Sequence, residues 1–224
     1  MYRQPQKSSQ NNVSDPLEGF LYLNRALTYE VFSSLRAVLF KWDVEKLYIF
    51  FFCDGEISED DYESAQCIAT QMIANFNNFL LDVEIIRLDY PSPVPEIGVL
   101  AYHRYESGVD FSKEQEQVKK LLMQNTAIAP RIKMLIAVIV GSLGGIFSTL
   151  RSLQIKSNNK SISLCFYTEG EVSQTNLSLL ELITSYVASC LPDCAVQYEN
   201  FRWDYPKEIP TDNTTIVYFR KEYR

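Results

Sequence analysis

The pentapeptide Arg-Leu-Asp-Tyr-Pro at residues 87–91 decides the fold, because it returns 115 residues later as Arg-Trp-Asp-Tyr-Pro at residues 202–206. Two more pairs of segments match at the same offset: 32–36 with 147–151, and 54–58 (Asp-Gly-Glu-Ile-Ser) with 169–173 (Glu-Gly-Glu-Val-Ser). After the proline-containing loop the offset becomes 116, and 102–106 matches 218–222. We interpret these matches as an internal duplication with one inserted loop residue.

The repeat period is too long for a solenoid or propeller, whose units span roughly 20 to 50 residues. Each copy is therefore expected to be a domain-sized unit, and 224 residues with 46% hydrophobic content can form two modest cores. The expected organisation is a flexible tail (1–16), a first copy (17–108), a charged linker (109–131) and a second copy (132–224).

Apolar spacing and turn residues predict the same six elements in each copy. In the first copy these are a helix, two strands, a helix begun by a Ser-x-x-Asp capping box at Ser58 and Asp61, and two final strands, at 17–27, 31–42, 47–53, 58–79, 83–89 and 99–105. Short connections favour antiparallel neighbours. The expected fold class is α+β, with two tandem α-β-β-α-β-β two-layer sandwiches, each with an antiparallel sheet.

Two related units are expected to pack about a pseudo-two-fold axis, as the subunits of a homodimer do. A further homodimer of the whole chain stays open. The apolar segment 134–146 is too short to cross a membrane and contains three glycines, so we expect a buried helix followed by a turn and no membrane insertion. The tail has no apolar core of a signal peptide, and five cysteines in mostly apolar segments are typical of a reduced, cytoplasmic protein.

Charge is distributed unequally between the copies. Residues 17–108 hold 15 acidic and 6 basic residues, a net charge of −9, whereas 109–224 hold 12 acidic and 13 basic, a net charge of +1. The densest acidic group consists of Asp54, Glu56, Glu59, Asp60, Asp61 and Glu63. It is either a solvated face that favours solubility or a docking surface for a basic protein. Nucleic acid is disfavoured as a ligand, because an overall charge of −7 repels phosphate.

Repeated arginines suggest a second kind of site. Arg87 and Asp89 lie two apart on a strand, so Arg87 could pair with Asp54 or Glu56 in a structural salt bridge, the interpretation we favour. The alternative is a ligand-binding cleft between the copies that holds a carboxylate or phosphate. Its candidate residues are Arg87, Arg104, Arg202 and Arg220.

Catalysis finds little support in the sequence. Asp54 and Glu56 could act as an acid and a base or hold a metal ion, but carboxylates are also common around glycine turns. His103 is the only histidine, and Phe219 stands at its place in the second copy. Phosphate-binding, dinucleotide-binding, nucleophile-elbow and zinc-site motifs are not found. We predict no catalytic residues, no cofactor and no metal site.

The pattern Asp-Gly-Glu-Ile-Ser, then Arg-Leu-Asp-Tyr-Pro, then Tyr-x-Arg resembles small, single-unit bacterial proteins of immunity type. The resemblance implies an inhibitor that binds and masks a toxin domain without chemistry of its own. The leading hypothesis is therefore a non-enzymatic, cytoplasmic protein that binds a basic toxin or nuclease through the acidic first copy. The alternative is a ligand-sensing or scaffolding protein with the arginine-lined cleft.

Overall fold

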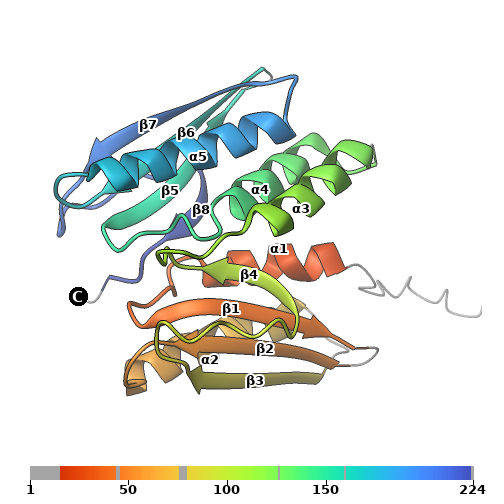
Figure 1. Ribbon diagram of the computed structural model, residues 1–224, viewed down its shortest axis with the longest axis vertical. Helices are drawn as coiled ribbons and strands as arrows, with labels where there is room; N and C mark the ends of the chain where they lie inside the picture. The colour runs from red at the N-terminus through yellow and green to blue at the C-terminus, as the bar shows by residue number, and fades with distance from the viewer. Residues whose placement is uncertain (1–15, 44–45, 76–79, 126, 159, 223–224) are drawn as a thin grey trace, which may run out of the picture.

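The structure is a computed structural model that describes residues 16–43, 46–75, 80–125, 127–158 and 160–222. The first half contains α1 (Pro16–Leu27), β1 (Leu35–Trp42), β2 (Lys46–Cys53), α2 (Glu59–Asn75), β3 (Leu80–Arg87) and β4 (Val99–His103). The second half contains α4 (Pro130–Gly141), β5 (Leu150–Ser157), β6 (Ser161–Thr168), α5 (Gln174–Cys190), β7 (Ala195–Arg202) and β8 (Thr215–Phe219). The α+β class and the tandem α-β-β-α-β-β order are confirmed (Figure 1). The expected N-terminal tail lies almost wholly outside the described residues.

Each half forms one four-stranded sheet, in the order β3-β2-β1-β4 and β7-β6-β5-β8. The expected all-antiparallel pairing is wrong at one place in each sheet, because β2 pairs parallel with β3 and β6 pairs parallel with β7. The helix between the two strands explains the difference. A helical crossover such as α2 returns the chain to the edge where the previous strand began, so the next strand runs in the same direction. The sheets are therefore mixed.

Helix boundaries follow local sequence signals. Ser58 and Asp61 form the expected capping box, because the backbone N–H of Asp61 donates to Ser58 Oγ and the backbone N–H of Ser58 donates to Asp61 Oδ2, over 3.2 and 3.1 Å. In the second half, Pro130 occupies the first turn of α4, where its missing N–H costs nothing. The expected buried helix and turn at 134–146 are confirmed, and Gly144 closes the turn at φ +68°.

The segment expected to link the copies, 109–131, carries helix α3 (Ser112–Gln124). This helix packs against α4 and α5, and the Tyr186 hydroxyl donates to the carbonyl of Gln115 over 2.8 Å. The linker therefore contains a helix that packs on the second half.

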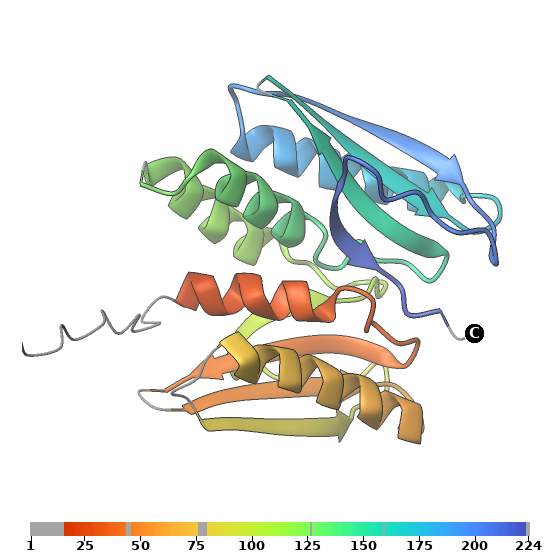
Figure 2. The same cartoon turned by 180° about the vertical axis from the view of Figure 1, so that it is seen from behind.

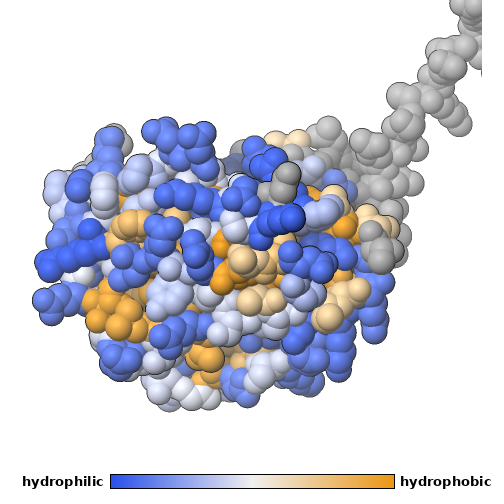
Figure 3. Space-filling model, turned by 90° about the horizontal axis from the view of Figure 1, so that it is seen from above, coloured by the Kyte–Doolittle hydropathy of each residue, from blue (hydrophilic) through white to orange (hydrophobic). Residues whose placement is uncertain are grey.

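One continuous hydrophobic core joins the halves, with buried side chains from α1, α4 and both sheets. Helices α1 and α4 lie in the middle of the molecule, while β3 and β7 lie at its opposite ends (Figure 1, and from behind in Figure 2). Viewed from the end of the second half, hydrophobic patches are small and separated by polar residues (Figure 3). The buried apolar side chains of each copy pack against its own sheet and against the other copy.

Candidate functional site

The two copies face each other through reciprocal contacts. The N–H of Tyr29 donates to the carbonyl of Phe219 over 3.2 Å, and the N–H of Gly144, the repeat equivalent of Tyr29, donates to the carbonyl of His103 over 3.0 Å. Two isolated β-bridges show the same reciprocity, because Val31 pairs with Arg220 and the equivalent Ile146 pairs with Arg104. Contacts of i with j and of j with i are the signature of a two-fold interface. The expected pseudo-two-fold packing is thus present inside one chain.

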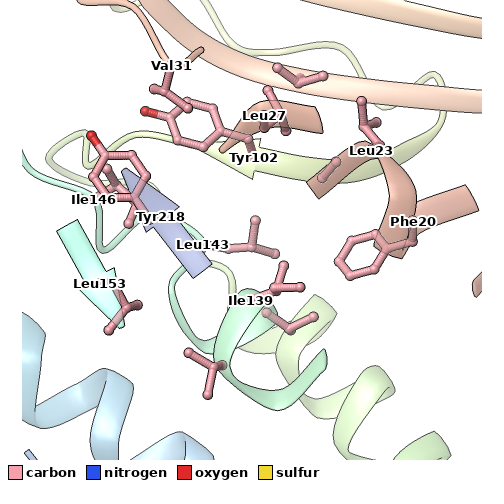
Figure 4. Close-up of a cluster of buried hydrophobic side chains, with 14 of the residues drawn as sticks. Phe20, Leu23, Leu27, Val31, Tyr102, Ile139, Leu143, Ile146, Leu153 and Tyr218 are labelled. Carbon is pink, nitrogen blue, oxygen red and sulfur yellow. The ribbon is translucent and has the colours of Figure 1, made fainter. Parts of the chain in front are cut away.

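Buried tyrosines mark the centre of this interface. Tyr102 and its equivalent Tyr218 lie close together, with Val31 and Ile146 beside them and Leu27 of α1 and Ile139 of α4 nearby (Figure 4). Burial raises the pKa of both phenols, so they stay neutral. The strand predicted at 31–42 is wrong at its start, because β1 begins only at Leu35. Val31 instead forms an isolated bridge with Arg220 of the other copy.

A cleft of about 870 Å³ opens next to these tyrosines. Both copies line it with equivalent residues, among them the following pairs: Phe32 and Phe147, Ser33 and Ser148, Tyr90 and Tyr205, Arg104 and Arg220, and Glu106 and Glu222. The volume lies in the range of roughly 300–1,000 Å³ typical of ligand sites. A cleft between the copies was expected, but its tyrosines and serines were not among the candidate residues.

The cleft contains two of the four candidate arginines, and both are already paired. Arg104 binds Asp54 over 2.5 Å and Glu106 over 3.0 Å. Arg220 binds Glu169 over 2.7 Å and lies 3.8 Å from Glu222. The hydrogen bond from Arg104 and that from the Tyr90 N–H outweigh partial burial and lower the pKa of Asp54. The partner of Asp54 is therefore Arg104 and not Arg87.

Arg87 and Arg202 do not line the cleft. They end β3 and β7, the strands farthest from the other copy, and each binds the aspartate two residues further on. Asp89 also accepts the N–H of Gly55, and Asp204 accepts the N–H of Gly170. The Arg-x-Asp motif thus ties the end of a strand to the glycine turn, and the expected cluster of four arginines is not assembled.

A buried guanidinium fixes each proline-containing loop. Arg36 binds Glu106 through Nε–Oε1 (2.6 Å) and Nη2–Oε2 (2.7 Å), and also donates to the carbonyls of Leu88 and Ser92. Arg151 repeats this arrangement with Glu222, Trp203 and Lys207. The matched segments 32–36 and 102–106 signalled these residues as repeated, but only the tertiary structure brings them together.

The acidic group of the first copy divides in two. Asp61 is buried and accepts hydrogen bonds from Ser58 and Ser34, and Asp54 is paired with Arg104. Neither is presented to solvent as a free carboxylate. The exposed members, all before α2 or in its first turns, are Glu56, Glu59, Asp60 and Glu63.

His103 is buried, and Nδ1 lies 2.6 Å from the carbonyl of Arg104. Burial lowers its pKa below the ordinary value of 6.5. In the described part of the chain, no group of three or more His, Cys, Asp or Glu side chains could hold a metal ion. None of the helices built from described residues is long and apolar enough to cross a membrane.

These features define the class of protein: a duplicated α+β protein whose two copies face each other across a shared cleft, with an exposed acidic cluster at the start of α2 in the first copy. The chain belongs to the MafI2 immunity protein family, whose model matches it twice, over residues 18–106 and 131–222. The two matches fall one on each copy. No curated protein matches the sequence.

Proposed function

We propose that this chain is a non-enzymatic immunity protein that inhibits a basic toxin or nuclease domain by binding and masking it. The double match to the MafI2 immunity protein family carries the proposal. Inhibition by masking requires a stable surface and no chemistry. We place the encounter in the cytoplasm, where the five free thiols would remain reduced.

The exposed carboxylates of the first copy support a basic partner. Glu56, Glu59, Asp60 and Glu63 surround the start of α2, and the second copy has Glu171, Gln174, Thr175 and Ser178 at the equivalent places. Negative charge at a helix start is also stabilising, so the patch needs no partner to persist. Its restriction to one copy, however, gives the molecule a strongly negative side, and such fields speed association with oppositely charged proteins.

Reversal of two charges tests this surface. We expect the double substitution Glu59→Lys, Asp60→Lys to weaken binding of the captured toxin domain at least ten-fold and to make it less sensitive to salt. The matched control is Gln174→Lys, Thr175→Lys in the second copy, which should leave affinity nearly unchanged. Capture uses the intact chain as bait at low and high salt, followed by titration with the purified toxin domain. Equal affinities of the wild type and both variants for the toxin domain would contradict the proposal that the acidic surface binds it.

The alternative function is ligand sensing in the cleft, and the volume of the cleft favours it. Pairing of Arg104 and Arg220 with carboxylates argues against it, because little positive charge remains for an anionic ligand. A thermal shift by a small anion that disappears in Arg104→Ala would reverse this ranking.

A further inference from the structure

Two tyrosines stand at equivalent places on the walls of the cleft. Tyr90 is 46% exposed and Tyr205 is 45% exposed. The guanidinium carbon of Arg36 lies 5.9 Å from the Tyr90 ring centroid, and that of Arg151 lies 5.8 Å from the Tyr205 ring centroid. Both arginines are buried and bound to glutamates, so each tyrosine ring lies on a fixed guanidinium. The rest of each ring reaches solvent. Rigid, half-exposed tyrosines are typical of surfaces that bind proteins.

The interior of the cleft is apolar or charge-compensated. Phe32 and Phe147 contribute buried rings, while Arg104 and Arg220 are neutralised by the carboxylates beside them. A small anion would have to displace these carboxylates. An apolar or aromatic side chain would instead find neutral surroundings and tyrosine rings on both sides.

The cleft borders on α2 of the first copy through Lys221. Lys221, which lines the cleft, donates from Nζ to Ser64 Oγ over 2.6 Å, and Ser64 lies one turn after Asp60 on α2. The Ser64 hydroxyl in turn donates to the carbonyl of Asp60 over 2.8 Å. One wall of the cleft therefore adjoins the turn that carries the exposed carboxylates. The ammonium of Lys221 lies 3.8 Å from a Glu30 carboxylate oxygen, and the exposed Glu59, Asp60 and Glu63 lie on the same helix as Ser64.

From this geometry we infer that the cleft receives a segment of the toxin itself, with an apolar or aromatic side chain at its tip and lysine or arginine residues beside it. The inference rests on the proposed immunity function and adds where the partner enters. The cleft needs both copies, because each supplies only one wall. Tandem duplication within one chain thus creates the site at every concentration, whereas separate copies would first have to associate.

Occlusion of the cleft tests the inference without removal of any contact in the fold. Ser33 and Ser148 are exposed residues that line the cleft, and we expect Ser33→Trp and Ser148→Trp each to weaken binding of the purified toxin domain at least ten-fold. Ser157→Trp is the matched control, since Ser157 is an exposed serine at the opposite end of β5. Circular dichroism and thermal unfolding should show all three variants folded. The pair Tyr90→Ala and Tyr205→Ala, which enlarges the cleft, should also weaken binding.

Salt dependence separates the two parts of the interface. Tryptophan substitutions should lower affinity by the same factor at low and high salt, whereas Glu59→Lys, Asp60→Lys should lower it mainly at low salt. If charge reversal weakens binding and the Ser33→Trp and Ser148→Trp variants both bind as the wild type does, the inference is overturned and the proposed function stands. If the wild-type chain binds no toxin domain, both fall. Unchanged toxin binding with a small molecule seated in the cleft would assign the cleft to that ligand instead.

Discussion

Arg36 and Glu106 are the most deeply buried ion pair of the first copy, with side chains 2% and 3% exposed. Burial alone would raise the pKa of Glu106, but the hydrogen bonds from Arg36 outweigh it and lower the pKa below the ordinary value of 4.5. The stabilisation that follows from this shift is present above pH 4.5 and is lost as the pH falls through the lowered pKa. The pair is thus a structural element of the loop that holds Tyr90, and not an acid or base for chemistry.

Removal of one partner should expose the cost of the buried charge. We expect Arg36→Met to lower the free energy of unfolding by about 3–5 kcal/mol, because Glu106 keeps only part of its hydrogen bonding. Arg87→Met, which breaks an exposed pair, should cost less than about 1 kcal/mol. Denaturant titration gives both values. Addition of Glu106→Leu to Arg36→Met should recover part of the loss, and equal losses for Arg36→Met and Arg87→Met would contradict this account.

Helices α2 and α5 are equivalent elements that begin differently. Both have a serine cap, with Ser58 Oγ and Ser173 Oγ accepting the N–H three residues later. Only α2 has a buried carboxylate at that third position, where Asp61 accepts hydrogen bonds from Ser58 and from the Ser34 hydroxyl. Asn176 replaces it in α5, and the hydroxyl of Thr149, the equivalent of Ser34, is buried without a hydrogen-bond partner among the described residues. The acidic residue at 61 therefore belongs to the fold, while its neighbours 59 and 60 are available to a partner.

Alanine substitutions at the two equivalent positions should separate these roles. Asp61→Ala should destabilise the protein by about 1–2 kcal/mol, because the cap and the Ser34 hydroxyl lose their acceptor. Asn176→Ala should cost less than about 0.5 kcal/mol. Chemical denaturation monitored by circular dichroism compares them. A loss as large for Asn176→Ala would mean that the carboxylate at 61 does not stabilise the start of α2.

On the scale of the whole molecule, the two copies are not independent domains joined by a linker. Their buried side chains form one core, and their backbones exchange hydrogen bonds on both sides of the pseudo-two-fold axis. Unfolding of one copy would expose the apolar surface of the other copy to water, so partial unfolding carries a large free-energy cost. A shared core predicts a single cooperative transition.

The two tryptophans can report on this cooperativity, because Trp42 lies in the first copy and Trp203 in the second. We expect the single-tryptophan variants Trp203→Phe and Trp42→Phe to show fluorescence transitions that coincide with the loss of helical circular dichroism in each variant. Coincident probes indicate two-state unfolding. Separate midpoints for fluorescence and circular dichroism, with one copy melting first, would show that the copies are energetically independent.

Repetition along the chain was enough to establish the duplication, the order of elements and the capped start of α2. These features depend on residue spacing and on interactions between near neighbours, which the sequence displays directly. The repeated Arg-x-Asp-Tyr-Pro and Asp-Gly-Glu segments were likewise recognisable as parts of the fold. Charge asymmetry between the copies also needed no coordinates.

The tertiary structure alone decided which charged groups meet. Arg104 reaches Asp54 across the sheet, and Arg36 reaches Glu106 from 70 positions away, so neither pairing could be read from local spacing. The parallel pairing of β2 with β3 arose from the helical crossover, and it put Arg87 on the strand farthest from the second copy. The cleft exists because two separately encoded surfaces meet at a pseudo-two-fold axis, and such contacts depend on the folded shapes of both copies and not on the order of residues within either one.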